Sequence, residues 1–210
     1  MMASRLLIIG AGGHGRVVAD AAEVSGQWAK IAFVDDQYPD LSSSGFWPVI
    51  GRVDDLDKLR SEWQHAIVGV GNNSLRSKLI NSCKALGYSV ATIIHPSAVI
   101  ANNSTIGEGA VIFANAVVNT GSAIGRGVVI NTAATVDHDC TLGESVHLSP
   151  GVHLGGSVKI GNHSWLGVGA SVINNCTLGS AVTVGAGAVV IDDVADSTKV
   201  VGVPAKPVKK

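Results

Sequence analysis

An aliphatic residue recurs at every sixth position through the second half of the chain. The series runs from Ile94 to Val190, and all 17 of its positions hold Ile, Leu or Val. Four positions after each of them stands Ala, Ser, Cys or Val, again without an exception. An amphipathic helix repeats its apolar positions every 3.6 residues and a half-buried strand every two, so a period of six fits neither element. The pattern predicts a solenoid, in which each hexapeptide contributes one short extended segment and one corner.

Both recurring positions of the hexapeptide are expected to point into this solenoid. One short segment cannot bury its apolar side alone, so the core forms only when successive coils stack. Glycine often follows the aliphatic residue directly, and we expect it to supply corner backbone angles that other residues resist. These glycines are Gly107, Gly125, Gly143, Gly155, Gly161, Gly167, Gly179 and Gly185.

The first 90 residues show a different pattern, in which apolar runs alternate with helical spacing. They predict strands at 5–9, 31–36, 66–70 and 88–94, and helices at 17–24, 54–63 and 74–86. Strands that alternate with helices indicate a small parallel sheet of the α/β class. We therefore expect a Rossmann-like domain at 1–90, a parallel β-solenoid at 91–196 and a short tail at 197–210.

A glycine-rich turn, Gly10-Ala-Gly12-Gly-His-Gly15, connects the first expected strand to the first expected helix, and the acidic pair Asp35-Asp36 follows about 20 residues later. Glycines let the backbone approach a phosphate at a helix N-terminus, where N–H groups and the helix dipole favour an anion. Taken alone, the motif also fits an NAD-binding domain. The α/β region is too short for both halves of a dinucleotide fold, so a mononucleotide is favoured, and a tight turn without a ligand stays open.

The composition narrows the class of protein. With 46% hydrophobic residues, 15% charged residues and a net charge of -1, the chain has neither the composition of a disordered tail nor a basic footprint for nucleic acid. Three cysteines without CxxC spacing indicate neither a disulfide framework nor a zinc site. No targeting signal and no apolar run of about 18 residues is present, so we expect a cytoplasmic protein without membrane insertion.

The repeat resembles that of the hexapeptide-repeat acyltransferases. The resemblance implies a left-handed β-helix with three hexapeptides per turn, and hence nearly six coils for this chain. Members of that family are typically homotrimers that bind acyl-CoA in grooves between neighbouring helices, so the resemblance also implies a homotrimer with active sites between subunits.

The whole chain is similar to a narrower group, the sugar acetyltransferases related to sialic acid O-acetyltransferases. Within it, the glycine turn, the acidic pair and Val136-Asp-His138-Asp-Cys140 most resemble bacterial N-acetyltransferases of UDP-4-amino-4,6-dideoxy sugars of the bacillosamine type. The resemblance implies acetyl-CoA as cosubstrate and a UDP-linked amino sugar as acceptor. It also implies that the glycine turn holds the diphosphate and that the acidic pair contacts the uridine. The substrate-binding residues expected in this domain are Gly10, Gly12, Gly13, His14, Gly15, Asp35 and Asp36.

Acetyl transfer to an amine needs a base, and a neutral histidine is suited to that task at physiological pH. A neighbouring carboxylate can fix the tautomer of the imidazole and stabilise its protonated form. His138 lies between two such carboxylates, Asp137 and Asp139. The resemblance makes His138 the general base and Asp139 its partner, although the nearest relatives carry glutamate at the position of Asp139.

The same resemblance supplies the remaining candidates. His147 and Gly156 are expected at the acetyl-CoA site, with the Gly156 N–H facing the thioester carbonyl. Val168 and Ala186 are expected to line the same site, and Asn131 is expected to contact the sugar.

Other readings of the sequence stay open. The acceptor could be a hydroxyl, as in sialic acid O-acetylation, or an amino sugar on dTDP or GDP. The chain could also be a nicotinamide-dependent oxidoreductase or a sugar-binding scaffold without activity. A metal site is not expected, because the histidines of the repeat match no local ligand spacing. These histidines are His138, His147, His153 and His163.

Overall fold

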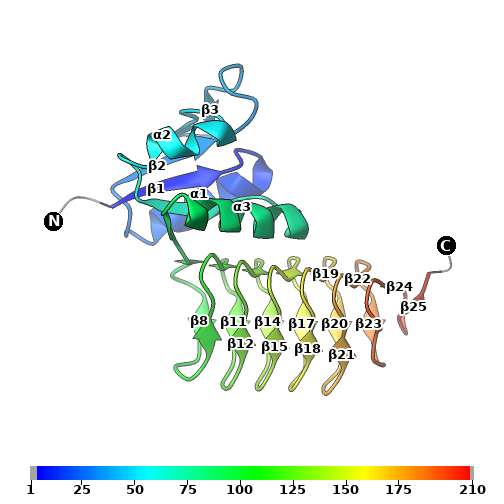
Figure 1. Cartoon of the computed structure of the whole chain (residues 1–210). Helices are drawn as coiled ribbons and strands as arrows, with labels where there is room; N and C mark the ends of the chain where they lie inside the picture. Colours follow the sequence, from blue (N-terminus) through cyan, green and yellow to red (C-terminus); the bar gives the residue numbers. More distant parts are fainter. Residues whose placement is uncertain (1–3, 209–210) are drawn as a thin grey trace. The chain divides into compact units, whose positions relative to one another are not determined.

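The computed structural model describes residues 4–208 and divides the chain into two compact units, one ending at Pro96 and the other beginning at Ser97. Figure 1 shows an α/β unit coloured blue to green and a solenoid of stacked coils coloured green to red.

The first unit is built on a four-stranded parallel sheet with the strand order β2-β1-β5-β6. Its elements are β1 (Arg5–Ile9), α1 (Gly13–Val24), β2 (Lys30–Val34), β3 (Ser43–Ser44), β4 (Trp47–Pro48), the 3-10 turn η1 (Val53–Asp55), α2 (Leu56–Leu59), β5 (His65–Val68), α3 (Asn73–Ala85), β6 (Ser89–Val90) and β7 (Ile93–Ile94). The chain leaves β1 for β2 on one side and returns through β5 on the other. Ligands of open α/β sheets bind at such a switch point, beside the carboxyl ends of the strands.

The expected elements of this unit are confirmed with four differences. The strand expected at 88–94 is two short strands, β6 and β7, and only β6 belongs to the four-stranded sheet. The first helix begins at Gly13 instead of 17, because Gly12 caps it and the glycine turn itself enters the helix. The helix expected at 54–63 is only one turn of α-helix after a 3-10 turn. Its apolar residues Leu56 and Trp63 are nevertheless buried in the core, and their burial explains the helical spacing of apolar residues in the sequence. The hairpin β3–β4 was not foreseen, because strands of two residues leave too short a pattern.

The second unit is a β-solenoid in which each strand from Val99 to Val172 pairs in parallel with the strand three positions further along the chain. Near its end, the strand at 199–201 pairs in parallel with the strand at 183–184 and antiparallel with the strand at 206–207. Val117, for example, pairs with Thr135, and Thr135 pairs with His153, so the register advances by 18 residues per coil. Three hexapeptides per coil and roughly six coils are thereby confirmed. The strands stack into three sheets, which form the three sides of the solenoid.

We call these sides face 1, face 2 and face 3. Face 1 holds β8 (Val99–Ile100), β11 (Val117–Val118), β14 (Thr135–Val136), β17 (His153–Leu154), β20 (Ser171–Val172) and β23 (Val189–Val190). Face 2 holds β9 (Thr105–Ile106), β12 (Ala123–Ile124), β15 (Thr141–Leu142), β18 (Lys159–Ile160) and β21 (Thr177–Leu178). Within this unit, face 3 holds β10 (Val111–Ile112), β13 (Val129–Ile130), β16 (His147–Leu148), β19 (Trp165–Leu166), β22 (Thr183–Val184), β24 (Lys199–Val201) and β25 (Lys206–Pro207).

The recurring aliphatic residues form the core of the solenoid, as expected. From Ile112 to Val190 every one of them is buried, with at most 3% of its surface exposed. Ile100 and Ile106 are only partly buried, since they lie in the first coil, which has a further coil on one side only. Ile94, the first position of the series, belongs to the first unit and is 36% exposed, so the period of six reports inward-facing positions only from Ile100 onwards.

The expected role of the corner glycines is wrong. The left-handed residues of the corners lie two positions further on, as at Gly127 (φ 64°) and Asp139 (φ 59°). The glycines that follow the aliphatic residues are needed for space instead. A Cβ added to Gly125 would lie 2.7 Å from the backbone of Gly143 in the next coil. Close stacking of coils, not backbone conformation, selects glycine there.

Candidate active site

The glycine turn of the first unit is fixed by a carboxylate from the neighbouring strand. Gly10 follows β1 with a φ of 99°, and its N–H donates to the carbonyl of Val34 at 2.9 Å. The Asp35 Oδ2 accepts the Ala11 N–H at 2.8 Å, and its Oδ1 accepts the Gln37 N–H at 3.0 Å. Both oxygens of Asp35 therefore bind backbone, which gives this residue a clear part in shaping the turn.

A cavity of about 170 Å³ opens beside the carboxyl ends of β1 and β5, at the switch point of the sheet. It is lined by Ile9, Gly10, Asp35, Asp36, Val53, Val70, Leu75 and Leu79. The structure thus brings together Gly10 and the acidic pair, as the sequence predicts. The Asp36 Oδ1 accepts the Val53 N–H at 3.3 Å, a longer contact than those of Asp35.

A buried arginine stands behind the glycine turn. The Arg76 side chain is fully buried and donates to the carbonyls of Val70 at 3.0 Å and Gly71 at 3.1 Å, and to the Asn73 Oδ1 at 2.8 Å. Burial lowers its pKa to about 10, so it stays charged at neutral pH. Burial and, second, the Arg76 charge lower the pKa of His14 to about 4. His14 is therefore neutral under physiological conditions.

The glycines of the glycine-rich turn differ in the space that is available for an added Cβ atom, and this difference predicts how alanine substitutions affect stability. A Cβ at Gly15 would overlap the carbonyl oxygen of Gly10 and lie 3.3 Å from Phe33, whereas a Cβ at Gly13 has nothing within 4 Å. Gly15→Ala is expected to destabilise the protein by about 1–3 kcal/mol, as overpacking does, and Gly13→Ala is its control. Thermal unfolding of both variants tests this, and equal melting temperatures would contradict it.

His138 lies at the corner between face 1 and face 2. We call residues 137–139, together with the stacked residues 119–121 and 155–157 of the adjacent coils, the His138 corner. The His138 side chain is 53% exposed, and its Nδ1 lies 2.9 Å from the Asp139 Oδ2. The Asp139 backbone has a left-handed φ of 59° and its N–H donates to the carbonyl of Thr120 at 3.0 Å. The predicted pair of His138 and Asp139 is thus assembled through the Nδ1 of the ring.

Gly156 stands directly over the imidazole, one coil further on. A Cβ added there would collide with the His138 Nε2 and lie 2.6 Å from its Cε1. No left-handed φ demands glycine at this position, so the space beside the ring does. The neighbouring N–H of Ser157 donates to the His138 carbonyl at 2.8 Å, and this hydrogen bond holds the backbone of residues 155–157 against that of residues 137–139. Gly156 therefore lies beside the Nε2 edge of the imidazole.

The other candidates lie elsewhere on the solenoid. Asn131, Val168 and Ala186 all follow face 3 strands and share the corner between face 3 and face 1, which we call the Val168 corner. The Asn131 Oδ1 accepts the Thr132 N–H at 2.8 Å, and Val168 is 56% exposed. His147 lies on face 3 itself and is 8% exposed. Within one chain, these residues and His138 occupy different sides of the solenoid.

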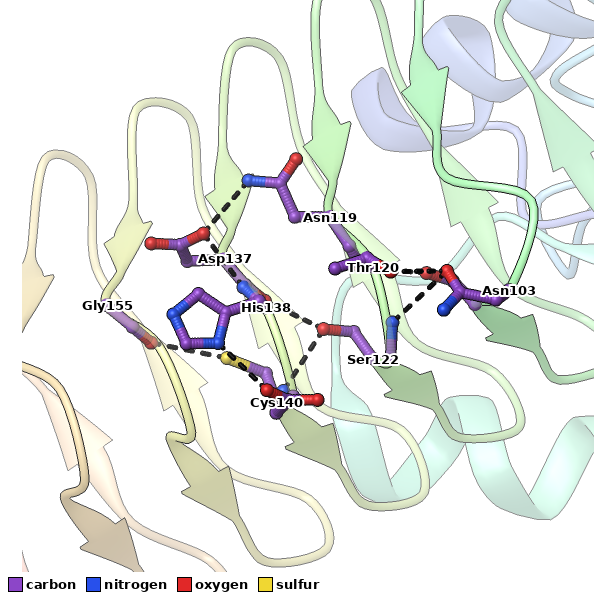
Figure 2. A network of polar contacts seen from close by, with 11 residues as sticks. Asn103, Asn119, Thr120, Ser122, Asp137, His138, Cys140 and Gly155 are labelled. Carbon is purple, nitrogen blue, oxygen red and sulfur yellow. Dashed lines mark hydrogen bonds and ion pairs between the residues drawn. The ribbon is translucent and has the colours of Figure 1, made fainter.

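Two residues of the His138 corner did not stand out in the sequence. An added Cβ at Gly121, which has a φ of 73°, would collide with the Asp139 Oδ1. Asn119 donates from Nδ2 to the Asp137 Oδ1 at 3.0 Å (Figure 2). Both lie 18 residues from their partners, a separation that becomes informative only when the number of residues per coil is known.

The carboxylates around His138 predict the pH dependence of catalysis. The hydrogen bond to Asp139 and, second, the charge of Asp137 raise the pKa of His138 above its ordinary 6.5. Only the neutral imidazole accepts a proton, so kcat/KM is expected to fall as the pH falls through this raised pKa. Asp139→Asn should move the midpoint to lower pH, and pH–rate profiles of both proteins measure it. A midpoint that does not move would contradict the role of Asp139.

Two further properties concern residues 4–208 only. In that range no group of three or more His, Cys, Asp or Glu side chains is arranged to hold a metal ion. No helix in the same range has the length and apolar character needed to cross a bilayer.

A three-sided solenoid of hexapeptides with an exposed histidine–carboxylate pair at a corner defines a hexapeptide-repeat acyltransferase. Residues 5–83 match the family described as PglD N-terminal domain. The chain is 34% identical over 107 residues to the UDP-N-acetylbacillosamine N-acetyltransferase of Bacillus subtilis (strain 168). That alignment covers 50% of this chain and 49% of the relative, so it spans about half the length of the curated protein.

Solved structures extend the similarity to the whole chain. The acetyltransferase domain of PglB from Neisseria gonorrhoeae FA1090, in complex with acetyl coenzyme A, is 45% identical with a TM-score of 0.95, covering 98% of this chain and 100% of that one. A variant of the GDP-perosamine N-acetyl transferase from Caulobacter crescentus, in complex with CoA and GDP-perosamine, is 38% identical with a TM-score of 0.93 and covers 100% and 99%. The chain belongs to the hexapeptide-repeat sugar acetyltransferases, and its solenoid is their left-handed β-helix.

Proposed function

We propose that the protein transfers an acetyl group from acetyl-CoA to the 4-amino group of a UDP-linked 4-amino-4,6-dideoxy sugar. The observation that carries this proposal is the His138 corner, where Nδ1 is bound to Asp139 and Nε2 faces Gly156. The relatives named as N-acetyltransferases of nucleotide amino sugars support the same reaction.

The chemistry follows from the two ring nitrogens of His138. With Nδ1–H donating to Asp139, Nε2 carries the lone pair and acts as the general base. The sugar amine attacks the thioester carbonyl, and the nitrogen of the tetrahedral intermediate gives its proton to Nε2. The C–S bond then breaks, and the imidazolium can return the proton to the leaving CoA thiolate. The Gly156 N–H is suited to stabilise the oxyanion, because it lies beside the ring that marks the reacting atoms.

The nucleotide is assigned to the cavity at the switch point of the first unit. Its apolar lining suits the faces of a base, and Asp36 offers a carboxylate to base or ribose groups that donate hydrogen bonds. The diphosphate is assigned to Gly12 and Gly13, where the start of α1 is open and any added Cβ would meet nothing within 4 Å. His14, neutral in this setting, can contact the sugar or the diphosphate.

A thiol-release assay with acetyl-CoA and a panel of 4-amino-4,6-dideoxy sugars on UDP, dTDP and GDP tests the proposal. The expected result is turnover that is fastest with the UDP sugar. A preference for the GDP sugar is the alternative that the Caulobacter crescentus relative favours, and it would correct the nucleotide only. Turnover with free sialic acid and none with any amine would overturn N-acetylation.

We further propose a homotrimer with each active site between two chains. His138, Asp139 and Gly156 lie at the His138 corner. Asn131, Val168 and Ala186 lie at the Val168 corner, and these two corners are the two edges of face 1. If three chains pack around an axis with face 1 inwards, the His138 corner of one chain meets the Val168 corner of the next, as closed cyclic symmetry requires. Face 1 also begins with the 61% exposed Val99, an apolar side chain that such packing would cover.

Mixed trimers test this arrangement. His138→Ala and Val168→Asp are each expected to be nearly inactive, the second because its carboxylate repels the CoA phosphates. When the two variants are co-expressed and purified together, about a quarter of the wild-type activity should return, since one of three sites in every mixed trimer has both corners intact. Sites built within one chain would give no recovery, and sedimentation analysis would measure the number of chains.

A further inference from the structure

Two carboxylates flank the catalytic histidine, and only one of them binds its ring. Asp139 accepts from the His138 Nδ1 at 2.9 Å, whereas Asp137 accepts the His138 backbone N–H at 2.8 Å. The same Asp137 oxygen also accepts the Asn119 Nδ2 at 3.0 Å (Figure 2). Asn119 comes from the preceding coil, where it occupies the corner position that Asp137 occupies in its own coil.

The inner side of this corner is held by a buried hydroxyl. Ser122, 1% exposed, donates to the Asp137 carbonyl at 2.7 Å and accepts the Cys140 N–H at 3.1 Å. The backbone on both sides of His138 is therefore fixed from within the solenoid. The inner contacts do not determine the direction of the half-buried Asp137 side chain. The Asn119 amide, from the preceding coil, is the group that does so.

We propose that Asn119 is a positioning residue, which holds the Asp137 carboxylate on the His138 backbone and so reserves the imidazole Nδ1 for Asp139. This inference rests on the proposed role of His138 as base. If Asp137 were released, it could compete for the ring. The His138 ring would then populate two orientations or tautomers. Only the pairing of Nδ1 with Asp139 leaves the Nε2 lone pair beside Gly156.

The residues around the His138 ring support these separate roles, in which Asp137 binds the backbone and Asp139 binds the ring. The titratable groups at the corner are Asp137, Asp139 and the buried thiol of Cys140, whose pKa is raised by burial. The adjacent coils contribute residues 119–121 and 155–157, and none of them has a titratable side chain. The His138 backbone hydrogen bond and, second, Asn119 lower the pKa of Asp137. Asp137 thus remains an anion that would attract the imidazole if it were released.

Asn119→Ala tests the proposal, alone and in an Asp137→Ala background. Alanine is compatible with this corner position, because Ala101 occupies it one coil earlier, and the Asn119 backbone bond to the Val136 carbonyl is kept. We expect kcat to fall about tenfold, the scale of a hydrogen bond to a charged group, with KM for acetyl-CoA unchanged. In the Asp137→Ala background the same substitution should have no further effect.

Asn162→Ala is the matched control, since the Asn162 Oδ1 accepts the Glu144 N–H at 2.8 Å at a corner that carries no proposed catalytic group. It should leave kcat unchanged. An equal fall in kcat for Asn119→Ala in both backgrounds, or an equal fall in the control, would overturn the proposal, because either result would mean a general loss of corner stability.

A measurement without turnover separates this inference from the proposed function. Ring ¹⁵N chemical shifts of His138 report the tautomer in the resting protein. We expect the Nδ1–H form in wild type, a mixture in Asn119→Ala, and the Nδ1–H form again when Asp137→Ala is added. An unchanged tautomer in Asn119→Ala overturns the positioning role even if acetyl transfer is found, whereas the expected series supports it even if the acceptor proves to be different.

Discussion

Replacing His138 by alanine is expected to lower kcat for acetyl transfer by about 10² or more, which is the range that general base catalysis contributes. The substitution removes the only group at the corner that can take the amine proton at neutral pH. The ring is 53% exposed and packs no core, so the fold should be unaffected. Steady-state kinetics give kcat, and calorimetric titration with CoA should show binding within a few-fold of wild type.

His163→Asn is the control for this prediction. His163 lies at the corner between face 2 and face 3, away from the proposed interface, and its φ of 60° is one that asparagine also adopts. It should retain wild-type kcat. If His138→Ala kept full activity, the protein would be a scaffold or would use another base, and the proposed function would fail.

Gly156→Ala is expected to lower kcat by about 10²-fold, because a displaced catalytic group loses orientation even when the shift is only about 1 Å. The added methyl would occupy the place of the His138 Nε2 and force the ring away from its present position. The backbone at Gly156 is not left-handed, and the colliding atoms belong to an exposed, movable side chain, so the melting temperature should change little.

Testing Gly156→Ala in a His138→Ala background shows whether its effect on kcat passes through the His138 ring. In His138→Ala the colliding ring is absent, so Gly156→Ala should then have little further effect on the residual rate. Full additivity of the two losses would contradict the geometry and would point to an effect of the added methyl that does not pass through His138, such as a displaced Gly156 N–H that no longer reaches the oxyanion. Comparing kcat of the two single variants with that of the double variant distinguishes these cases.

Adjacency in the chain gave His138 two carboxylate neighbours, and the resemblance to sugar acetyltransferases implied Asp139 as its partner. The structure places the His138 Nδ1 and the Asp139 Oδ2 2.9 Å apart. The sequence could not predict Asn119 or Gly121, since the contacts of both with this corner depend on the number of residues in each coil. The expectation for the corner glycines was wrong for a related reason. Backbone angles are a local property, whereas the need for space at Gly125 comes from the next coil.

Asn131 shows the converse, because residues that are close in the sequence can lie far apart on the solenoid. It stands seven residues before His138 in the sequence, yet face 1 separates the two corners, so the pair can act together only across two chains or along a long ligand. The acidic pair was predicted as one unit, and the structure distinguishes its members. Asp35 uses both oxygens to hold backbone N–H groups, while Asp36 makes a single longer contact beside the cavity.

The sequence by itself determined that the second half is a solenoid with a period of six, because inward positions recur along the chain and need no knowledge of distant contacts. It also determined the α/β character of the first unit and the chemistry available at each position. Only the tertiary structure decided which residues of the adjacent coils contact His138 and Asp139. Closure of three hexapeptides into one coil places residues 18 apart on top of each other, and that stacking brings Gly121, Asp139 and Gly156 to one corner.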